Sequence, residues 1–207
     1  MPKLSDEVKT KRRTKILDAA FIVFSARGFT STTIDHIALE SGVSKGGIYT
    51  YYASKEEIFL EIATQRFRKR SELFSSIKQE HLNQNGIINY EFLLRDYLKS
   101  VLISLSDPEV LNTAKFSFEF WSIVTRDPAH KQLANSRYSD FYQDLSLHIS
   151  EGIHAGFFKK NINLDAIGYI ILSTLDGMMH THVIMGIPLS NSAIDHYIDA
   201  IMSILLV

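Results

Sequence analysis

The chain is 207 residues long, with 22 Lys and Arg, 23 Asp and Glu, and no Cys. This length gives one or two domains enough residues to bury a sizeable core. The absence of cysteine excludes disulfides and thiolate metal ligands, and it favours an intracellular, cytoplasmic protein. A hydrophobic content of 45% with 22% charged residues is typical of a folded globular chain and excludes a disordered one.

The net charge of −1 hides an uneven distribution along the chain. Residues 1–55 hold nine of the Lys and Arg and five of the Asp and Glu, which gives that segment a net charge of +4. Residues 56–207 hold the remaining 13 basic and 18 acidic residues, a net charge of −5. Such an asymmetry indicates an N-terminal segment that binds a polyanion, although a basic solubilising tail produces the same pattern.

Apolar residues recur at helical spacing along the chain, without sustained alternation of the strand type, and the chain is therefore predicted to be all-α. Prolines at positions 108, 128 and 188 lie at polar turns that separate the predicted helices. The most hydrophobic stretch contains charged and histidine residues, so it is predicted to be a buried helix and not a membrane span. In chain order, the predicted helices cover residues 9–27, 33–40, 45–51, 55–81, 88–105, 108–126, 129–157, 164–185 and 192–206.

Glycines and capping residues mark several helix ends. Gly28 is predicted to end the first helix in a left-handed conformation, in the manner of a Schellman motif. Thr32 is predicted to cap the second helix and Ser44 the third. Ser54 has the spacing of a capping box at the start of the fourth helix, and Ser192 is predicted to cap the last one.

The second and third helices, joined by a turn at Gly42, form a candidate helix-turn-helix. The third helix is too short to be stable alone, so apolar residues such as Ile48 must hold it against the core. Glycines near its N-terminus, Gly46 among them, let a partner approach the backbone closely. The residues that face outward are candidates for base and phosphate contacts, or alternatively form the solvated face of a small bundle: Lys45, Tyr49, Thr50, Tyr51 and Lys55.

The stretches 32–38 and 41–59 closely resemble the DNA-binding region of the TetR family of bacterial transcriptional regulators. The resemblance covers about residues 12–60, at many positions with fixed spacing. It implies an N-terminal DNA-binding domain over residues 1–55 and a helical ligand-binding and dimerisation domain over residues 56–207. It also implies a homodimer that binds double-stranded DNA at a palindromic operator and that responds to a small-molecule effector.

Position by position, the resemblance implies that Thr33 and Tyr51 contact phosphates and that Lys55 reaches the DNA backbone. It places Lys45, Gly46 and Tyr49 at the surface of the major groove. The family often has a small hydroxylated or methyl-bearing residue at position 47, where this chain has glycine, so a base contact by that side chain is absent. The full set of DNA-binding candidates is Thr32, Thr33, Ser44, Lys45, Gly46, Gly47, Tyr49, Thr50, Tyr51 and Lys55.

The C-terminal part suggests two further sites. A dense group of aromatic residues indicates either ordinary core packing or a pocket for an apolar or aromatic effector. Helices with apolar or small residues on two sides indicate a four-helix dimer interface, with a thick monomer core as the alternative. The pocket candidates are Tyr97, Phe116, Phe120, Trp121 and Met178, and the interface candidates are Tyr138, Tyr142, Leu145, Ile149, Ile153, Ile171, Ser173, Gly177 and Thr181.

Motifs for catalysis, cofactor binding and metal binding are absent from the sequence. His180 and His182 are two positions apart and therefore lie on different sides of a helix. The predicted protein is a homodimeric, ligand-responsive repressor without catalytic residues, cofactor, metal or membrane partner. Two alternatives stay open, a DNA-binding scaffold or activator that needs no small ligand, and an all-helical enzyme, which the missing catalytic residues disfavour.

Overall fold

The computed structural model describes residues 5–124 and 126–206, without the side chains of some helical residues. Over these two ranges the secondary structure is helical, apart from a single bridge that pairs Phe158 with Leu206. The all-α prediction is confirmed. None of the helices within the described ranges is long and apolar enough to cross a membrane.

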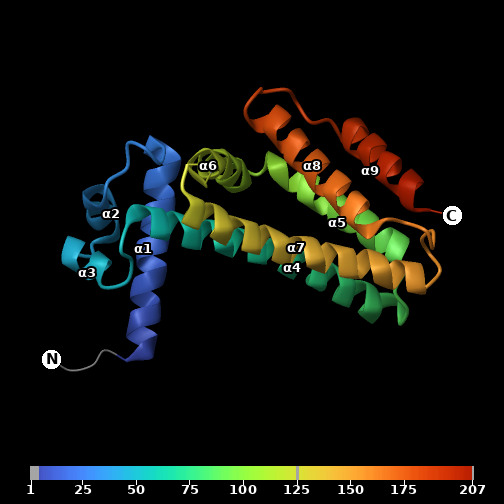
Figure 1. Cartoon of the computed structure of the whole chain (residues 1–207), viewed down its shortest axis with the longest axis horizontal. Helices are drawn as coiled ribbons and strands as arrows, with labels where there is room; N and C mark the ends of the chain where they lie inside the picture. Colours follow the sequence, from blue (N-terminus) through green and yellow to red (C-terminus); the bar gives the residue numbers. More distant parts are fainter. Residues whose placement is uncertain (1–4, 125, 207) are drawn as a thin grey trace. The chain divides into compact units, whose positions relative to one another are not determined.

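Figure 1 shows the helices, whose bounds lie within four residues of the predicted ones. A short 3-10 turn, η1, follows α5 where the sequence predicted a longer helix. In chain order, the elements are α1 (Asp6–Arg27), α2 (Ile34–Ser41), α3 (Lys45–Tyr49), α4 (Lys55–Asn85), α5 (Tyr90–Ile103), η1 (Ser104–Ser106), α6 (Pro108–Val124), α7 (Pro128–His154), α8 (Leu164–Val183) and α9 (Asn191–Leu205).

Two of the predicted caps lie one or two residues away from the residues that form them. Thr33, not Thr32, caps α2, and its hydroxyl accepts the backbone N–H of His36 while its own N–H donates to the His36 ring. Ser190, not Ser192, caps α9. In both places neighbouring residues of the same type compete, and the residue with extended backbone geometry takes the position.

Gly28 ends α1 with a positive φ of 75°, as predicted, but its ψ of 163° lies outside the left-handed helical region. The chain therefore leaves α1 extended, without a Schellman motif. At the start of α4 the Ser54 hydroxyl accepts the Glu57 N–H, whereas the Glu57 carboxylate accepts from Ala53 and not from Ser54. One hydrogen bond of the predicted capping box is therefore formed, and the other is made to the residue before Ser54.

The chain divides into two compact units, and each unit is made of two separate stretches of the sequence. The first unit joins the chain up to Arg66 with Lys115–Ala134, and the second joins Phe67–Ala114 with the chain from Asn135 onward. Helices α4, α6 and α7 each contribute residues to both units. The predicted domain boundary after residue 55 coincides with the start of α4 and stays a prediction.

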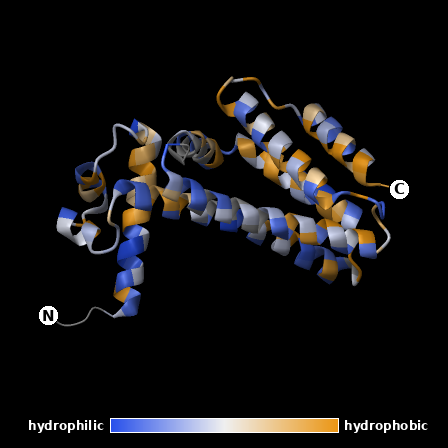
Figure 2. Ribbon diagram, in the orientation of Figure 1, coloured by the Kyte–Doolittle hydropathy of each residue, from blue (hydrophilic) through white to orange (hydrophobic). Residues whose placement is uncertain are grey.

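The core of the first unit lies where α1, α2, α3 and the start of α4 meet. Ile16, Ile37 and Ile48 are completely buried there. The Phe29 ring packs against Phe59, with ring centroids 4.9 Å apart. Figure 2 shows hydrophilic residues along the first half of α1 and hydrophobic ones along its second half. Helix α1 therefore contributes to this core from Ile16 onward.

The second unit is a bundle in which α5 packs on α9 and α4 lies alongside α7. Leu98 of α5 and Met202 of α9 are completely buried, and the Lys99 ammonium lies 2.9 Å from the Asp195 carboxylate across the same pair of helices. Between α4 and α7, the Phe74 ring stacks on His148 with centroids 3.9 Å apart. Ion pairs at the rim therefore accompany an apolar interior.

Candidate nucleic-acid interface

A tight turn at Gly42 joins α2 to α3. Gly42 has a φ of +62°, in the left-handed region that glycine adopts without strain. The Ser41 hydroxyl accepts the Val43 N–H at 3.2 Å and holds the turn from inside. This turn sets the angle between the two helices, so the predicted helix-turn-helix is formed.

Helix α3 has only five residues, and its position depends on one buried face. Ile48 is completely buried and Tyr52, just beyond the helix, is 2% exposed. The Ser44 hydroxyl caps α3 by accepting the Gly47 N–H at 3.1 Å, as the sequence predicted. A helix this short has no independent stability, so contacts of this kind must hold it on the unit.

The opposite face of α3 carries the residues predicted to contact bases. Tyr49 is 50% exposed, and a Cβ added at Gly46 meets no atom within 4 Å. Gly47 has less room, because a Cβ there lies 3.0 Å from a Val43 methyl group. The exposed surface of α3 is therefore open backbone at Gly46 flanked by the Lys45, Tyr49 and Thr50 side chains.

Lys45 is not a free cation in this structure. Its ammonium lies 2.9 Å from the Asp35 carboxylate at the start of α2, and this hydrogen bond raises the pKa of Lys45 above its ordinary value. Both side chains are more than half exposed. Such a pair is weak in water, so the lysine can leave it for a phosphate or a base.

Three of the other predicted contact residues have hydroxyl groups that already serve the fold. Thr32 is buried, and its hydroxyl donates to the Gly28 carbonyl at 2.7 Å. The hydroxyls of Thr33 and Ser44 cap α2 and α3. Tyr51 is half-buried and packs on the core. Their roles at DNA stay predictions, with Thr33 and Ser44 the exposed members.

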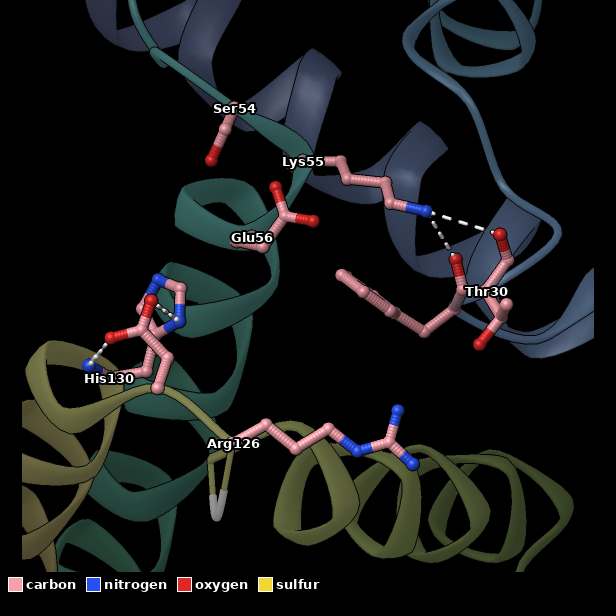
Figure 3. A pocket seen from close by; sticks show the side chains of 8 residues that line it. Thr30, Ser54, Lys55, Glu56, Arg126 and His130 are labelled. Carbon is pink, nitrogen blue, oxygen red and sulfur yellow. Dashed lines mark hydrogen bonds and ion pairs between the residues drawn. The ribbon is translucent and has the colours of Figure 1, made fainter.

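Lys55 makes an arrangement that the sequence did not predict. Its ammonium donates to the carbonyls of Phe29, Thr30 and Thr32, at 2.9, 3.2 and 2.8 Å. Figure 3 shows the side chain extending from the start of α4 to the connection between α1 and α2. The ammonium also lies 4.5 Å from the centroid of the Phe29 ring. A phosphate contact by Lys55, which stays a prediction, competes with these acceptors.

Beside Lys55 the first unit has a polar groove with a volume of about 540 Å³. Arg126, Asp127 and His130 line its far side, at the start of α7. Asp127 caps α7 by accepting the Ala129 N–H at 2.8 Å, and it lies 3.4 Å from the His130 ring. Sequence reasoning missed this groove because its two sides are about 70 residues apart in the chain.

One predicted pocket residue, Tyr97, lies at the centre of the second unit. It is 1% exposed, and its hydroxyl is buried without a hydrogen-bond partner among the residues that the structure describes. Burial raises the pKa of Tyr97 to about 12, so the hydroxyl is a neutral donor at physiological pH. Met178 is half-buried on α8. The side chains of Phe116, Phe120 and Trp121 lie outside those that the structure describes, as does that of Tyr138.

The predicted dimer residues divide into two groups. Leu145, Ile149 and Ile171 are at most 3% exposed, so they belong to the core of the second unit. Tyr142 and Ile153 are half-buried. Ser173, Gly177 and Thr181 are exposed along α8. They lie on the same helix as the exposed Tyr169 and Ile170, and the exposed Ile184 directly follows its C-terminal end. The small-residue stripe thus faces away from the core.

Among the described residues, no group of three or more His, Asp or Glu side chains is placed to hold a metal ion.

Comparison with known proteins matches both parts of the chain. Residues 16–62 match the model of bacterial regulatory proteins of the tetR family, and residues 93–191 match that of the tetracyclin repressor-like C-terminal domain. The chain is 30% identical to the HTH-type transcriptional regulator YfiR of Bacillus subtilis, over 86% of this chain and 83% of YfiR. It is 22% identical to the HTH-type transcriptional repressor AcnR of Corynebacterium diphtheriae, over 86% and 85%. The structure of FadR from Bacillus subtilis in complex with stearoyl-CoA is similar in fold, with a TM-score of 0.68 and 19% identity over 93% and 97%.

Proposed function

The chain belongs to the tetR family of bacterial regulatory proteins and is a DNA-binding transcriptional regulator, and we propose that it is a homodimeric repressor released from a palindromic operator by a small apolar or aromatic effector. The exposed face of α3 carries this proposal. Tyr49, Thr50, Lys45 and the open backbone at Gly46 project from a helix whose other side is fully buried. That is the arrangement a recognition helix needs in a major groove.

The charge distribution supports the assignment of DNA binding to this end of the chain. Residues 1–55 have a net charge of +4, whereas residues 56–207 have a net charge of −5. Because few basic residues lie near α3, one subunit can neutralise only a few phosphates. A second copy doubles that number and adds a second recognition helix, so operator binding depends strongly on dimerisation.

We place the dimer interface on the exposed side of α8. Ser173, Gly177 and Thr181 let another helix approach closely, and the exposed Tyr169 and Ile184 supply apolar area. Leu145, Ile149 and Ile171 support this surface from within the core.

The effector site is proposed within the second unit, around Tyr97. A neutral hydroxyl without a partner in an apolar interior gains a hydrogen bond when a ligand supplies an acceptor. The stearoyl-CoA in the FadR structure gives an apolar ligand in a chain of this fold. Effector binding lowers operator affinity only if the ligand binds the free and DNA-bound states unequally.

DNA selection tests the central assignment. Duplexes selected from a random pool by the wild-type protein are expected to share a two-fold symmetric sequence. Tyr49→Ala and Lys45→Ala are expected to weaken binding to the selected duplex about tenfold each, as lost base contacts do. The control, Phe92→Ala, removes an exposed aromatic residue of α5 and is expected to bind like wild type. Selection of no common sequence would contradict the proposed function.

A single glycine tests the interface. A Cβ at Gly177 meets no atom within 4 Å, so Gly177→Leu fits the isolated subunit and clashes only with a partner helix. Sedimentation is expected to show dimer dissociation at concentrations at least tenfold higher than for wild type. Ser76→Leu, on the exposed side of α4, is the matched control. An unchanged dissociation constant for Gly177→Leu places the interface elsewhere.

A further inference from the structure

A carboxylate from α6 holds the connection between α1 and α2. The backbone N–H of Phe29 donates to the Glu119 carboxylate, and the two residues are 90 positions apart in the chain. Both belong to the first unit. Phe29 is 6% exposed, so this N–H has little access to water and needs an acceptor from the protein.

The preceding residue shows that the local backbone accommodates this carboxylate. A Cβ added at Gly28 lies 2.9 Å from one Glu119 oxygen, and Gly28 also has a φ of +75°. A side chain at position 28 is therefore disfavoured by the backbone conformation, and it would also require the Glu119 carboxylate to shift. A hydrogen bond between an ionised carboxylate and an amide is stronger than one between neutral groups.

The connection is thus held from two sides by opposite charges. Glu119 accepts a backbone N–H of Phe29, and Lys55 donates to three carbonyls of the same connection. The segment held in this way continues into Thr33, which caps α2. Both contacts end on backbone atoms, so they fix where α2 begins. Because α2 and the turn at Gly42 orient α3, they also fix the recognition helix.

We propose that Glu119 is a positioning residue for operator binding, which holds the start of α2, and through it α3, in the arrangement that fits DNA. This inference rests on the proposed function of α3. Glu119 touches the connection and not the exposed face of α3, so it acts through the backbone. Helix α6 also contributes Pro108–Ala114 to the second unit.

The sign of the effect separates positioning from simple electrostatics. Removing an acidic residue from a DNA-binding unit raises affinity for DNA, because the polyanion is repelled less. The positioning role has the opposite sign, since a displaced α3 loses base contacts. Two conservative variants separate the causes. Glu119→Asp keeps the charge and shortens the reach by one methylene, and Glu119→Gln keeps the reach and an acceptor oxygen.

The probe is the duplex selected by the wild-type protein, compared with an unrelated duplex of the same length. Glu119→Ala and Glu119→Asp are expected to weaken specific binding at least fivefold and to leave binding to the unrelated duplex unchanged or stronger. Glu119→Gln is expected to stay within twofold to threefold of wild type. Glu56→Ala removes a carboxylate from the neighbouring groove and is expected to bind as tightly as wild type or slightly tighter.

Hydrogen exchange supplies a measurement that needs no DNA. Mass spectrometry of the peptide spanning residues 24–33 is expected to show faster exchange in Glu119→Asp than in wild type, and unchanged exchange in Glu56→Ala. The inference is overturned if Glu119→Asp binds the selected duplex as tightly as wild type, or if the exchange of this peptide does not change. If the wild type selects no duplex, the proposed function fails, and the exchange result still shows whether the bond holds the connection.

Discussion

The two compact units use their charged side chains differently. In the first unit, Lys55 and Glu119 end on backbone atoms of one connection. In the second unit, ion pairs join side chains of neighbouring helices, such as Lys78 with Glu151 at 2.6 Å and Arg95 with Asp199 at 2.7 Å, and among its charged side chains Lys159 also donates to the backbone, at the Ser203 and Ile204 carbonyls. A hydrogen bond to a backbone atom fixes that segment in one place. Two flexible side chains, in contrast, can stay paired while their helices shift relative to each other.

This difference matches the two tasks of a regulator. A recognition helix must present its side chains within a fraction of an ångström, which backbone-anchored contacts favour. A domain that responds to a ligand needs two arrangements of similar free energy. Partly exposed ion pairs contribute little stability each, so exchanging one arrangement of helices for another costs little at such contacts.

Each unit also contains a buried tyrosine whose pKa is lowered in part by an arginine. Tyr52 in the first unit has the Arg13 guanidinium 5.5 Å from its ring centroid, and this cation offsets part of the rise in the pKa of Tyr52 that burial causes. Burial raises the pKa of Tyr97 in the second unit to about 12, and the Arg70 charge offsets it only in part. The hydroxyls of both tyrosines are buried without a hydrogen-bond partner among the described residues, so the two sites differ in the cation beside the tyrosine and not in hydrogen bonding.

The largest expected effect tests whether the first unit depends on its apolar core. Ile48→Ala removes a completely buried side chain from α3 and is expected to cost about 2–5 kcal/mol. Since α3 is five residues long, it cannot persist without this contact, and binding to the selected duplex should be lost. Thermal unfolding measures the loss of stability, and the fluorescence anisotropy of a labelled selected duplex measures the loss of binding. Binding that stays within twofold of wild type would show that α3 is held by other contacts.

The second prediction concerns the second unit at high pH. The folded-state pKa of Tyr97, about 12, exceeds its ordinary value of 10. The neutral hydroxyl therefore contributes stability that is complete below pH 10 and is lost as the pH rises from 10 to 12. Two pKa units correspond to about 3 kcal/mol. The stability of wild type should fall more steeply over this range than that of Tyr97→Phe.

Urea unfolding at pH 8 and pH 11.5 measures this difference. At pH 8, Tyr97→Phe is expected to be as stable as wild type or slightly more so, because the hydroxyl that it removes has no partner. Tyr169→Phe is the control, since Tyr169 is 71% exposed. Parallel pH profiles for wild type and Tyr97→Phe would mean that folding does not raise the pKa of Tyr97, as expected if water or a hydrogen-bond donor reaches its hydroxyl.

Local signals explain which parts of the molecule could be predicted from the sequence. The cap at Ser44 and the turn at Gly42 depend on residues within three positions, and both were predicted correctly. The cap of α2 was assigned to Thr32 and is formed by Thr33, because two adjacent threonines carry the same signal. Helix type and order follow from periodicity, whereas the choice between neighbouring caps depends on backbone geometry.

Contacts between distant residues were outside the reach of sequence reasoning. A lysine such as Lys55 is expected to point into solvent, and its three carbonyl acceptors lie 23 to 26 positions away in the chain. Glu119 lies 90 positions from its donor, and its helix carries no motif that distinguishes it from other acidic residues. Ile171 was predicted at a dimer interface because apolar stripes look alike whether they face a core or a partner.

The smallest expected effect concerns the exposed pair on the DNA-facing surface. Lys45 and Asp35 are both largely exposed, so their pairing adds little stability, but it occupies a cation needed at DNA. Asp35→Asn removes one negative charge and frees Lys45, and it is expected to raise operator affinity about threefold at low salt. The gain should shrink as salt increases, and it should vanish in a Lys45→Ala background, where there is no cation to release.

Glu40→Gln, which removes a different exposed acid of α2, separates the release of Lys45 from the change in net charge. The same gain in Glu40→Gln, together with a gain that persists when Asp35→Asn is combined with Lys45→Ala, would show that the pair does not restrain Lys45. The exposed pair would then have no positional role, unlike the backbone-anchored contacts of Lys55 and Glu119.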